Sequence, residues 1–548
     1  MGEREITIEI KRPEVFILIG ILSIVLILEL QVTIPSPIAF GDEGFHTRLA
    51  QYIAEEKEIP VWIPFWGTEL IRSGYSRPPL WNLLEGGFYL VFGFSELIPK
   101  ILTPLISSIL IGLSVFLLGK KIYNKEVGFI GSIMSVTIPS IVTYAILFYT
   151  DTLFTFYFVL FILTFTLAIK SEKDKYWILA GIFGSFAFLT KSPGTTVFVL
   201  IFLGFVYQLY KKGNAYKLLK KYITLILLVG IIIGTFFLKN YVFFNTPFCD
   251  LDLPFFDNSG CIKRYEYKSE IESTGRYEPD IFESGFVNYI NFAYGSNQIG
   301  FVVLPFVFVG FLCGLIIIGS RKEIPDIIIL LSIISFIPVF YRSFGRGEDA
   351  ARFTLGMAPI ICLIAANYFE RIYDFIKKYH KLLILVFVGL IIFFSYQNLS
   401  QKLVGARSYD KDSGQYIGFK MFSPSFFKGT DFIKRNVSED ALIATVWDYA
   451  TVYNSQRNVV GLRGMPDEGD IVLSNDLNLS LSRLEVNGVT HIFVQKFSIN
   501  AQHYPPEFVQ LLENNPSSFV KIYETGPIVE DCIKAGGCDG VIVYKISY

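Results

Sequence analysis

The sequence predicts a polytopic α-helical membrane protein that ends in a smaller α/β domain. Of its 548 residues, 52% are hydrophobic and only 18% are charged, whereas soluble domains carry about 25% charged residues. Apolar runs of about 18 residues, the length of a transmembrane helix, recur over the first 400 residues. Beyond residue 405, short strand-like runs alternate with helical patterns, which is typical of an α/β domain.

We predict about eleven membrane-spanning helices. The first apolar run is not followed by the small-residue cleavage site of a signal peptide, so we interpret it as a retained helix. The predicted spans are residues 15–32, 97–118, 127–147, 152–169, 176–190, 194–210, 222–243, 299–318, 327–341, 352–369 and 381–396.

Basic residues gather in every second connection between these spans. The positive-inside rule makes those connections cytoplasmic, together with the N-terminus, and places the C-terminus outside the cell membrane. The net charge of −1 and the dispersed basic residues argue against a nucleic-acid partner. The basic residues of these connections are Lys120, Lys121, Lys125, Lys170, Lys173, Lys175, Lys211, Lys212, Lys217, Lys220, Lys221, Arg321, Lys322, Arg371, Lys377, Lys378 and Lys381.

Two domains follow from this division: a membrane domain over residues 1–400 and an external soluble α/β domain over residues 405–548. Two external segments of the membrane domain, 33–96 and 245–298, are too long to be simple connectors. The first carries an amphipathic helical pattern after Asp42 and a second apolar stretch after "RPPL". We expect both to be helices that lie in the membrane interface and wall a site there.

Four cysteines fall in predicted external segments. Cys249 and Cys261 share one loop, and Cys532 and Cys538 share the C-terminal region. Because disulfides persist in oxidising environments, we expect the pairs Cys249–Cys261 and Cys532–Cys538.

Acidic residues stand where the chain leaves the bilayer on the external side. Asp42 and Glu43 follow the first span, and Asp151 opens the fourth. An N-cap is the alternative role for Asp42 at the first position, and for Thr150 or Asp151 at the second, since helical patterns follow both. A catalytic carboxylate held between bilayer and water is the functional interpretation.

Cations are predicted at the same surface. Lys191 ends a short span, and Arg352 begins another just after Arg346. Each could pair with a lipid phosphate, although a snorkelling anchor is the alternative for Lys191. His46 lies near the carboxylates, but no local spacing supplies the ligands of a zinc site. The sequence leaves open whether a divalent cation binds between Asp42 and Asp151, and it predicts no other cofactor.

Four features occur in an order that resembles the GT-C membrane glycosyltransferases. They are Asp42-Glu43 after the first span, "RPPL" containing Arg77, "TDTLFTF" containing Asp151, and "LAGIFGSFAFLTKSPG" containing Lys191. The likeness covers roughly residues 30–210 and is nearest to the protein O-mannosyltransferase and lipid A aminoarabinose transferase group. The segment "RFTLGMAP" after Ala351 is similar to an Arg-aromatic-Pro segment of that group.

The resemblance implies an inverting transfer of a sugar from a polyprenyl-phosphate donor. It makes Asp42 the general base, supported by Glu43, with Asp151 as a second carboxylate of the site. Lys191 and Arg352 would bind the donor phosphate. To these we add Arg346 as a phosphate ligand, and His46 and Arg77 as substrate-binding residues.

A second stretch, "ATVWDYATVYNSQRNVV", resembles the Trp-Trp-Asp-Tyr-Gly segment of the oligosaccharyltransferase catalytic subunit. That resemblance assigns Trp447, Asp448 and Tyr449 to acceptor binding, although Val446 and Ala450 stand where the motif has Trp and Gly. The start of a helix in the α/β domain is the alternative interpretation of these three residues.

The sequence therefore predicts a membrane glycosyltransferase that moves a sugar to the hydroxyl of a glycan, lipid or protein. An oligosaccharyltransferase-like enzyme is one alternative. A transporter or a non-catalytic scaffold for surface polysaccharide is another, but a transporter should place its ionisable residues near the bilayer midplane.

Overall fold

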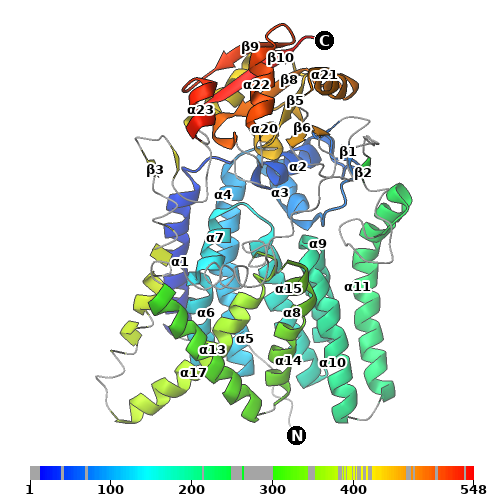
Figure 1. Ribbon diagram of the computed structural model, residues 1–548. Coiled ribbons are helices and arrows are strands. Elements are labelled where there is room, and N and C mark those ends of the chain that lie inside the picture. Colours follow the sequence, from blue (N-terminus) through cyan, green and yellow to red (C-terminus); the bar gives the residue numbers. More distant parts are fainter. Residues whose placement is uncertain are drawn as a thin grey trace.

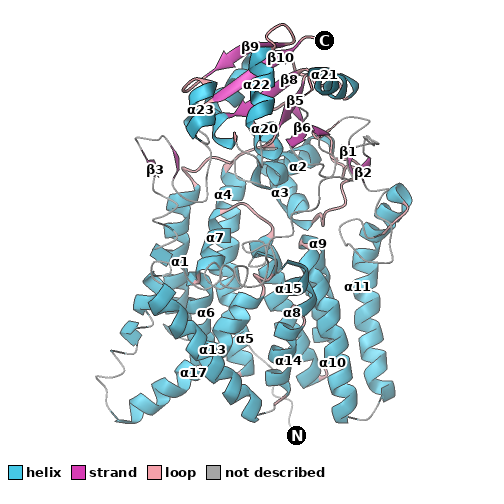
Figure 2. Ribbon diagram, in the orientation of Figure 1, coloured by secondary structure: helices cyan, strands magenta, loops and turns pink. Residues whose placement is uncertain are grey.

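The computed structural model shows a helical bundle that carries a small sheet domain at one end (Figures 1 and 2). The structure describes residues 13–38, 42–67, 72–212, 215–247, 262–263, 300–321, 323–343, 352–379, scattered positions from 386 to 403, 409–410, 415–416, 423–463, 471–472, 476–499, 504–535 and 538–548.

Apolar helices build the bundle. Among the residues that the structure describes, five helices are long and apolar enough to cross a bilayer, or six if a pair bent by 54° counts as one span. Shorter apolar helices overlap further predicted spans, so the chain is a multi-pass membrane protein and the count of about eleven stays a prediction. The bundle comprises α1 (Pro13–Thr33), α4 (Leu97–Pro104), the π-helix η1 (Leu105–Leu110), α5 (Ile111–Ile122), α6 (Lys125–Thr137), α7 (Pro139–Ile146), α8 (Asp151–Ser171), α9 (Asp174–Thr190), the 3₁₀ turn η2 (Ser192–Thr195), α10 (Thr196–Lys212), α11 (Ala215–Phe244), α13 (Gly300–Arg321), α14 (Ile324–Ile334), α15 (Ile337–Ser343) and α17 (Met357–Tyr379).

Helix α8 runs through the core of the bundle. Its aromatic residues recur every three or four positions, and the rings stack along one side of the helix: the centroids of Phe154 and Phe158 are 5.8 Å apart, and those of Phe161 and Phe165 are 5.4 Å apart. All four side chains are fully buried. Buried aromatic side chains contribute large apolar areas, so the position of the first residue of α8, Asp151, is firmly fixed.

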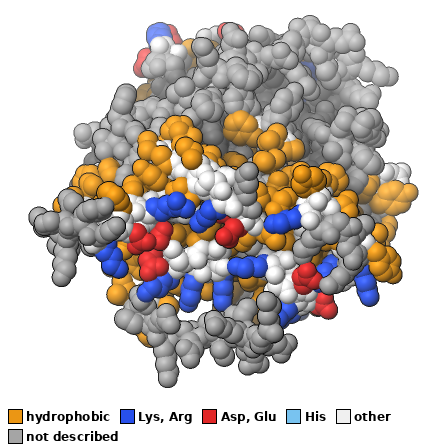
Figure 3. Space-filling model, turned by 90° about the horizontal axis from the view of Figure 1, so that it is seen from below, with side chains coloured by type: hydrophobic (Ala, Val, Ile, Leu, Met, Phe, Trp, Pro, Cys, Tyr) orange, Lys and Arg blue, Asp and Glu red, His pale blue; other side chains and the backbone are white. Residues whose placement is uncertain are grey.

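Basic side chains mark the end of the bundle that lies opposite the sheet domain. Seen from that end, Lys and Arg residues form a broad band between apolar helix surfaces (Figure 3). The positive-inside rule predicts that this end is cytoplasmic, and the orientation of the chain stays a prediction.

Two helices lie between the bundle and the sheet domain: α2 (Asp42–Glu56) and α3 (Leu80–Phe92). Helix α3 exposes Leu90, Val91 and Phe92, as expected of a helix in the membrane interface. The apolar side of α2 is used differently. Phe45 and Leu49 are buried in the apolar core of the C-terminal domain, so this side faces protein instead of lipid.

The C-terminal domain (residues 423–548) is a six-stranded sheet with helices. The strand order is β7-β6-β5-β8-β10-β9, parallel from β7 to β8 and antiparallel around β10. All residues of β5 and β8 are buried, as is usual for strands covered on both faces. The elements are α19 (Pro424–Asn436), β5 (Leu442–Thr445), α20 (Asp448–Ser455), β6 (Asn458–Arg463), β7 (Ile471–Val472), α21 (Leu477–Val486), β8 (His491–Gln495), the 3₁₀ turn η5 (Lys496–Ser498), α22 (Pro506–Asn514), β9 (Phe519–Glu524), α23 (Val529–Ala535) and β10 (Val541–Ile546).

The external segment 33–96 is joined to this sheet by backbone hydrogen bonds. The Gly67 N–H donates to the Val459 carbonyl at 2.7 Å, and the Val459 N–H donates to the Phe65 carbonyl at 3.2 Å. Further two-stranded pairings join β1 (Arg72–Ser73) to β2 (Ile262–Lys263) and β3 (Tyr409–Asp410) to β4 (Gln415–Tyr416).

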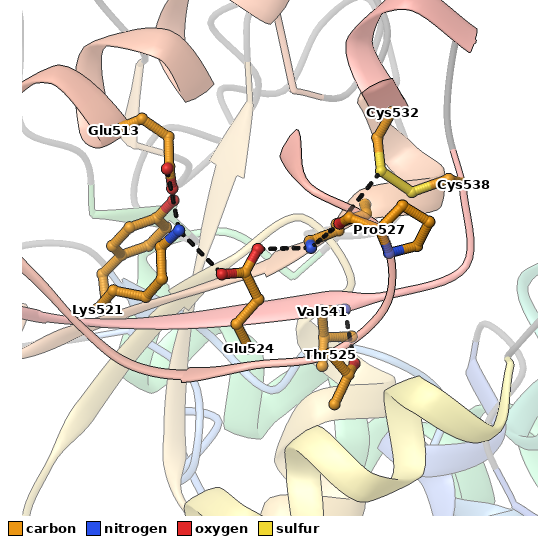
Figure 4. Close-up of polar contacts among 10 residues, drawn as sticks. Glu513, Lys521, Glu524, Thr525, Pro527, Cys532, Cys538 and Val541 are labelled. Atoms are coloured by element: carbon orange, nitrogen blue, oxygen red, sulfur yellow. Dashed lines mark hydrogen bonds and ion pairs between the residues drawn. A yellow bond between two sulfur atoms is a disulfide. The ribbon is translucent and has the colours of Figure 1, made fainter. Parts of the chain in front are cut away.

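A cluster of polar contacts joins β9 to the segment around α23 in the C-terminal domain (Figure 4). Cys532 and Cys538 form a disulfide, whereas Cys249 and Cys261 lie outside the described residues. The side chain of Lys496 is fully buried, and its Nζ donates to Glu524 Oε1 at 2.7 Å and to the Pro527 carbonyl. A buried lysine is tolerated because both partners replace its lost hydration.

We expect the close packing of α5 on α6 to depend on glycine. A Cβ at Gly119 would meet the Cα of Gly128 at 2.5 Å, whereas a Cβ at Gly230 would meet nothing within 4 Å. Gly119→Val should therefore destabilise the protein by about 1–3 kcal/mol, and Gly230→Val should change its stability little. Thermal unfolding in detergent measures both, and equal shifts would contradict this account of the helix crossing.

Candidate active site

The two acidic positions found in the sequence each open a helix at the end of the bundle that carries the sheet domain. Asp42 is the first residue of α2, and Asp151 is the first residue of α8. A helix N-terminus stabilises a carboxylate through its macrodipole. Of the two N-cap candidates at the second turn, Thr150 occupies the N-cap position of α8 and Asp151 follows it. The N-cap role stays an alternative for Asp42.

Arg352 joins the two carboxylates. Its Nη2 lies 2.6 Å from Asp42 Oδ2, and its Nε lies 3.3 Å from Asp151 Oδ2. The guanidinium also stacks on Tyr149, 4.4 Å from the ring centroid. A planar guanidinium with several donors suits such a bridge, so Arg352 brings together residues that are about 200 and 310 positions away in the sequence.

Two further cations extend this contact at either end. Lys191 donates to the second oxygen of Asp151, and Arg77 Nη1 lies 3.4 Å from Asp42 Oδ1. Five charges thus alternate along one line, which we call the charge chain: Arg77, Asp42, Arg352, Asp151 and Lys191. Three are positive and two are negative, so the chain carries one surplus positive charge.

The charge chain runs from a buried end to an accessible end. The side chain of Asp151 is fully buried and that of Lys191 is 9% exposed, whereas that of Arg77 is 36% exposed. Burial would raise the pKa of the Asp42 carboxyl, but the guanidinium groups of Arg352 and Arg77 and the nearby His46 hold its pKa well below the ordinary value. Asp42 is therefore ionised at neutral pH.

Glu43 contacts the backbone beside the charge chain. Its side chain is fully buried, and its Oε1 accepts the backbone N–H of Phe148 at 3.4 Å. Phe148 belongs to the turn between α7 and α8, immediately before Asp151. Glu43 thus ties the start of α2 to the start of α8, so it supports the spacing of the two carboxylates.

His46 lies one turn after Asp42 on α2. Its Nδ1 is 2.9 Å from Asn82 Oδ1, and Asn82 Nδ2 donates to the Tyr75 hydroxyl at 2.9 Å. Burial lowers the pKa of His46 to about 4, so the ring is neutral at pH 7. A neutral ring with Nδ1–H as donor leaves Nε2 as an acceptor. The sequence did not single out Asn82 or Tyr75.

The three residues Trp447, Asp448 and Tyr449 do not share one role. Helix α20 begins at Asp448, as the structural alternative in the sequence predicted. Trp447 Nε1 donates to Ser498 Oγ at 2.6 Å, and Asp448 Oδ2 accepts from Trp66 Nε1 at 2.7 Å. These two contacts hold the domain together and to the loop before α3. Tyr449 reaches the charge chain, because its hydroxyl is 3.3 Å from Arg77 Nη2.

Two predictions of the sequence analysis remain: Arg346 as a phosphate ligand and a divalent cation between Asp42 and Asp151. Arg346 lies outside the described residues. Arg352 and Lys191 contact the oxygens of Asp42 and Asp151, so in this arrangement side chains of the protein neutralise both carboxylates. Within the described ranges, no three His, Cys, Asp or Glu side chains gather as metal ligands.

Comparison with known proteins gives matches of two kinds. The family model described as dolichyl-phosphate-mannose-protein mannosyltransferase matches residues 76–237. No curated protein sequence matches the chain.

Several solved structures are similar over nearly the whole chain. The Archaeoglobus fulgidus oligosaccharyltransferase AglB, in complex with an inhibitory peptide and a dolichol-phosphate, covers 97% of this chain and 74% of its own, with a TM-score of 0.65 and 12% identity. ArnT from Cupriavidus metallidurans, bound to undecaprenyl phosphate, covers 96% of this chain and 97% of its own, with a TM-score of 0.58 and 12% identity. Arabinofuranosyltransferase AftD from Mycobacteria covers 97% of this chain and 40% of its own, with a TM-score of 0.57 and 10% identity. These likenesses confirm the fold expected from the sequence.

The buried pair at the inner end of the charge chain generates a stability prediction. Asp151→Ala leaves Lys191 buried without its carboxylate and should cost about 3–5 kcal/mol of folding free energy. Adding Lys191→Met removes the stranded charge and should restore most of that loss. Thermal unfolding in detergent measures the series. A double variant no more stable than Asp151→Ala would contradict the pairing.

Proposed function

We propose that this chain, which has the GT-C fold, is an inverting glycosyltransferase. It transfers a sugar from a polyprenyl-phosphate donor to an acceptor hydroxyl at the external surface of the cell membrane. The observation that carries this proposal is the charge chain: paired carboxylates and cations with one surplus positive charge, located where the membrane helices end.

The charge balance suits a lipid phosphate. A sugar linked to a lipid through one phosphate is a phosphodiester with a single negative charge. That charge would balance the one surplus positive charge of the charge chain. Arg352 and Lys191 are the cations nearest the membrane helices, and charge-assisted hydrogen bonds from such groups bind phosphate oxygens well. The same cations would stabilise the charge that develops on the leaving phosphate.

The acceptor hydroxyl needs a base that removes its proton. In the proposed step the acceptor oxygen attacks the anomeric carbon while the bond from that carbon to the phosphate oxygen breaks. The phosphate departs with the bonding electrons, and Asp42 takes the hydroxyl proton. A single displacement of this kind inverts the anomeric centre.

Arg352 links the two halves of this proposal. In the structure it is shared between Asp42 and Asp151, so a bound phosphate would compete with Asp42 for its Nη2. Drawing Arg352 toward the phosphate would raise the basicity of Asp42 when the donor is present. In the absence of a donor, Asp42 is paired with two guanidinium groups and is therefore a weak base.

The lipid phosphates bound in two of the similar structures support the proposed class of donor. One was solved with a dolichol-phosphate and another with undecaprenyl phosphate. The name of the matching family points to mannose, and the other relatives to different sugars. We therefore propose a hexosyl or pentosyl transfer and a glycan, lipid or protein acceptor.

An oligosaccharyltransferase-like reaction is the second candidate. The fold likeness to AglB, with a TM-score of 0.65, favours it, as does the contact of the Tyr449 hydroxyl with Arg77. The departures from the acceptor-binding motif at Val446 and Ala450 count against it. Mass spectrometry of the product would separate transfer of one sugar from transfer of an oligosaccharide.

Asp42→Asn tests the catalytic assignment. Removing a general base should lower sugar transfer by about 10²- to 10⁴-fold, measured in purified membranes supplied with polyprenyl-phosphate-linked sugars. Asp174→Asn is the matched control, since Asp174 is also the first residue of a helix but is exposed at the turn between α8 and α9. Full transfer by Asp42→Asn would reduce Asp42 to a structural role. A wild type that transfers nothing would favour the scaffold alternative.

Binding of the carrier lipid alone tests the competition for Arg352. Asp42→Asn should bind undecaprenyl phosphate several-fold more tightly than the wild type, because the competing carboxylate charge is gone. Arg352→Gln should bind it about tenfold or more weakly, as expected for loss of charge-assisted hydrogen bonds. Native mass spectrometry measures both, with Lys173→Met at the exposed α8–α9 turn as the control. Weaker binding by Asp42→Asn would contradict the competition.

A further inference from the structure

The C-terminal domain touches the catalytic helix directly. Helix α20 lies on α2 (Figure 1), and the two cross at Gly44. A Cβ on Gly44 would collide with the backbone carbonyl of Tyr449 and lie 3.0 Å from the Cβ of Tyr453. The absence of a side chain at Gly44 thus brings α20 within reach of Asp42, two residues earlier.

Arg77 is held in place from two sides at this crossing. Its guanidinium carbon lies 4.4 Å from the centroid of the Phe45 ring and 5.6 Å from that of Tyr449. The Tyr449 hydroxyl accepts from Arg77 Nη2, and Asp42 Oδ1 faces Arg77 Nη1. Phe45 belongs to α2 and Tyr449 to the C-terminal domain, so both parts of the protein contribute to the position of the guanidinium.

An arginine in this position needs such support. Its side chain is 36% exposed, and an exposed arginine is free to adopt many rotamers. The 3.4 Å contact with Asp42 alone is long for a charge-assisted bond. The aromatic contacts and the hydroxyl therefore determine where the guanidinium sits.

Helix α20, which carries Tyr449, is joined to the membrane domain by several separate contacts, so the loss of any one of them should leave the helix in place. Tyr453 donates to Glu96 Oε1 at 2.9 Å, and Asn454 Nδ2 donates to the Ile38 carbonyl at 3.1 Å. At the start of α20, Trp66 donates to Asp448. These contacts join α20 to three separate parts of the membrane domain.

We propose that Tyr449 is a positioning residue that sets Arg77 on Asp42 and so makes the C-terminal domain part of the active site. The inference rests on the proposed function. When a donor phosphate draws Arg352 away, Arg77 is the cation that still orients the Asp42 carboxylate. Tyr449 should then matter for the rate of transfer and not for the binding of the carrier lipid, whose cations Lys191 and Arg352 it does not touch.

The test compares two tyrosines of one helix. Tyr449→Phe removes the hydroxyl that holds Arg77, and Tyr453→Phe removes one that holds Glu96, so both variants lose one hydrogen bond between α20 and the membrane domain. We expect kcat to fall about tenfold in Tyr449→Phe and to stay near the wild-type value in Tyr453→Phe. Undecaprenyl phosphate binding should be unchanged in both.

A double-mutant cycle identifies the route of the effect. If Tyr449 acts through Arg77, Tyr449→Phe should lower kcat little further in an Arg77→Lys background. Equal kcat in the two tyrosine variants, full additivity with Arg77→Lys, or a loss of lipid binding as large as the loss of kcat would each overturn the inference. A wild type without transfer would instead overturn the proposed function itself.

Discussion

The bridge that Arg352 forms between Asp42 and Asp151 is the contact on which the rest of the site depends. Each carboxylate begins a different helix, and neither helix packs on the other through an extended apolar face. The guanidinium supplies a donor to each carboxylate while Lys191 neutralises the buried end. Without the cations, two carboxylates this close would repel each other in a poorly hydrated environment.

The surrounding fold keeps this bridge in place through rigid supports. The stacked phenylalanines of α8 fix Asp151 from below, and the backbone contact of Glu43 with Phe148 fixes the distance between the two helix starts. Asn82 and Tyr75 hold His46 beside Asp42. The charged residues are thus placed by buried apolar and neutral polar neighbours, which need no counter-ions of their own.

The sequence predicted the membrane class, the C-terminal sheet domain and the types of the central charges, because hydropathy and helix starts are local properties. It predicted that Asp42, Asp151, Lys191 and Arg352 lie at one end of the bundle but could not say which of them pair, since pairing is decided by the packing of helices far apart in the chain. The amphipathic pattern of α2 predicted an apolar face correctly. What that face touches, the core of the C-terminal domain and not lipid, is a tertiary choice that a periodic pattern does not encode.

The apolar outer side of α3 has a consequence for the depth of the whole site. Leu90, Val91 and Phe92 are 53%, 74% and 72% exposed, and in the predicted interfacial position of α3 acyl chains would cover them favourably. Asn82 on the same helix is hydrogen-bonded to His46, so α3 and the charged groups rise or sink together. Bilayer thickness therefore sets how far these charges stand from the lipid headgroups, and hydrophobic mismatch becomes a variable of the chemistry as well as of membrane insertion.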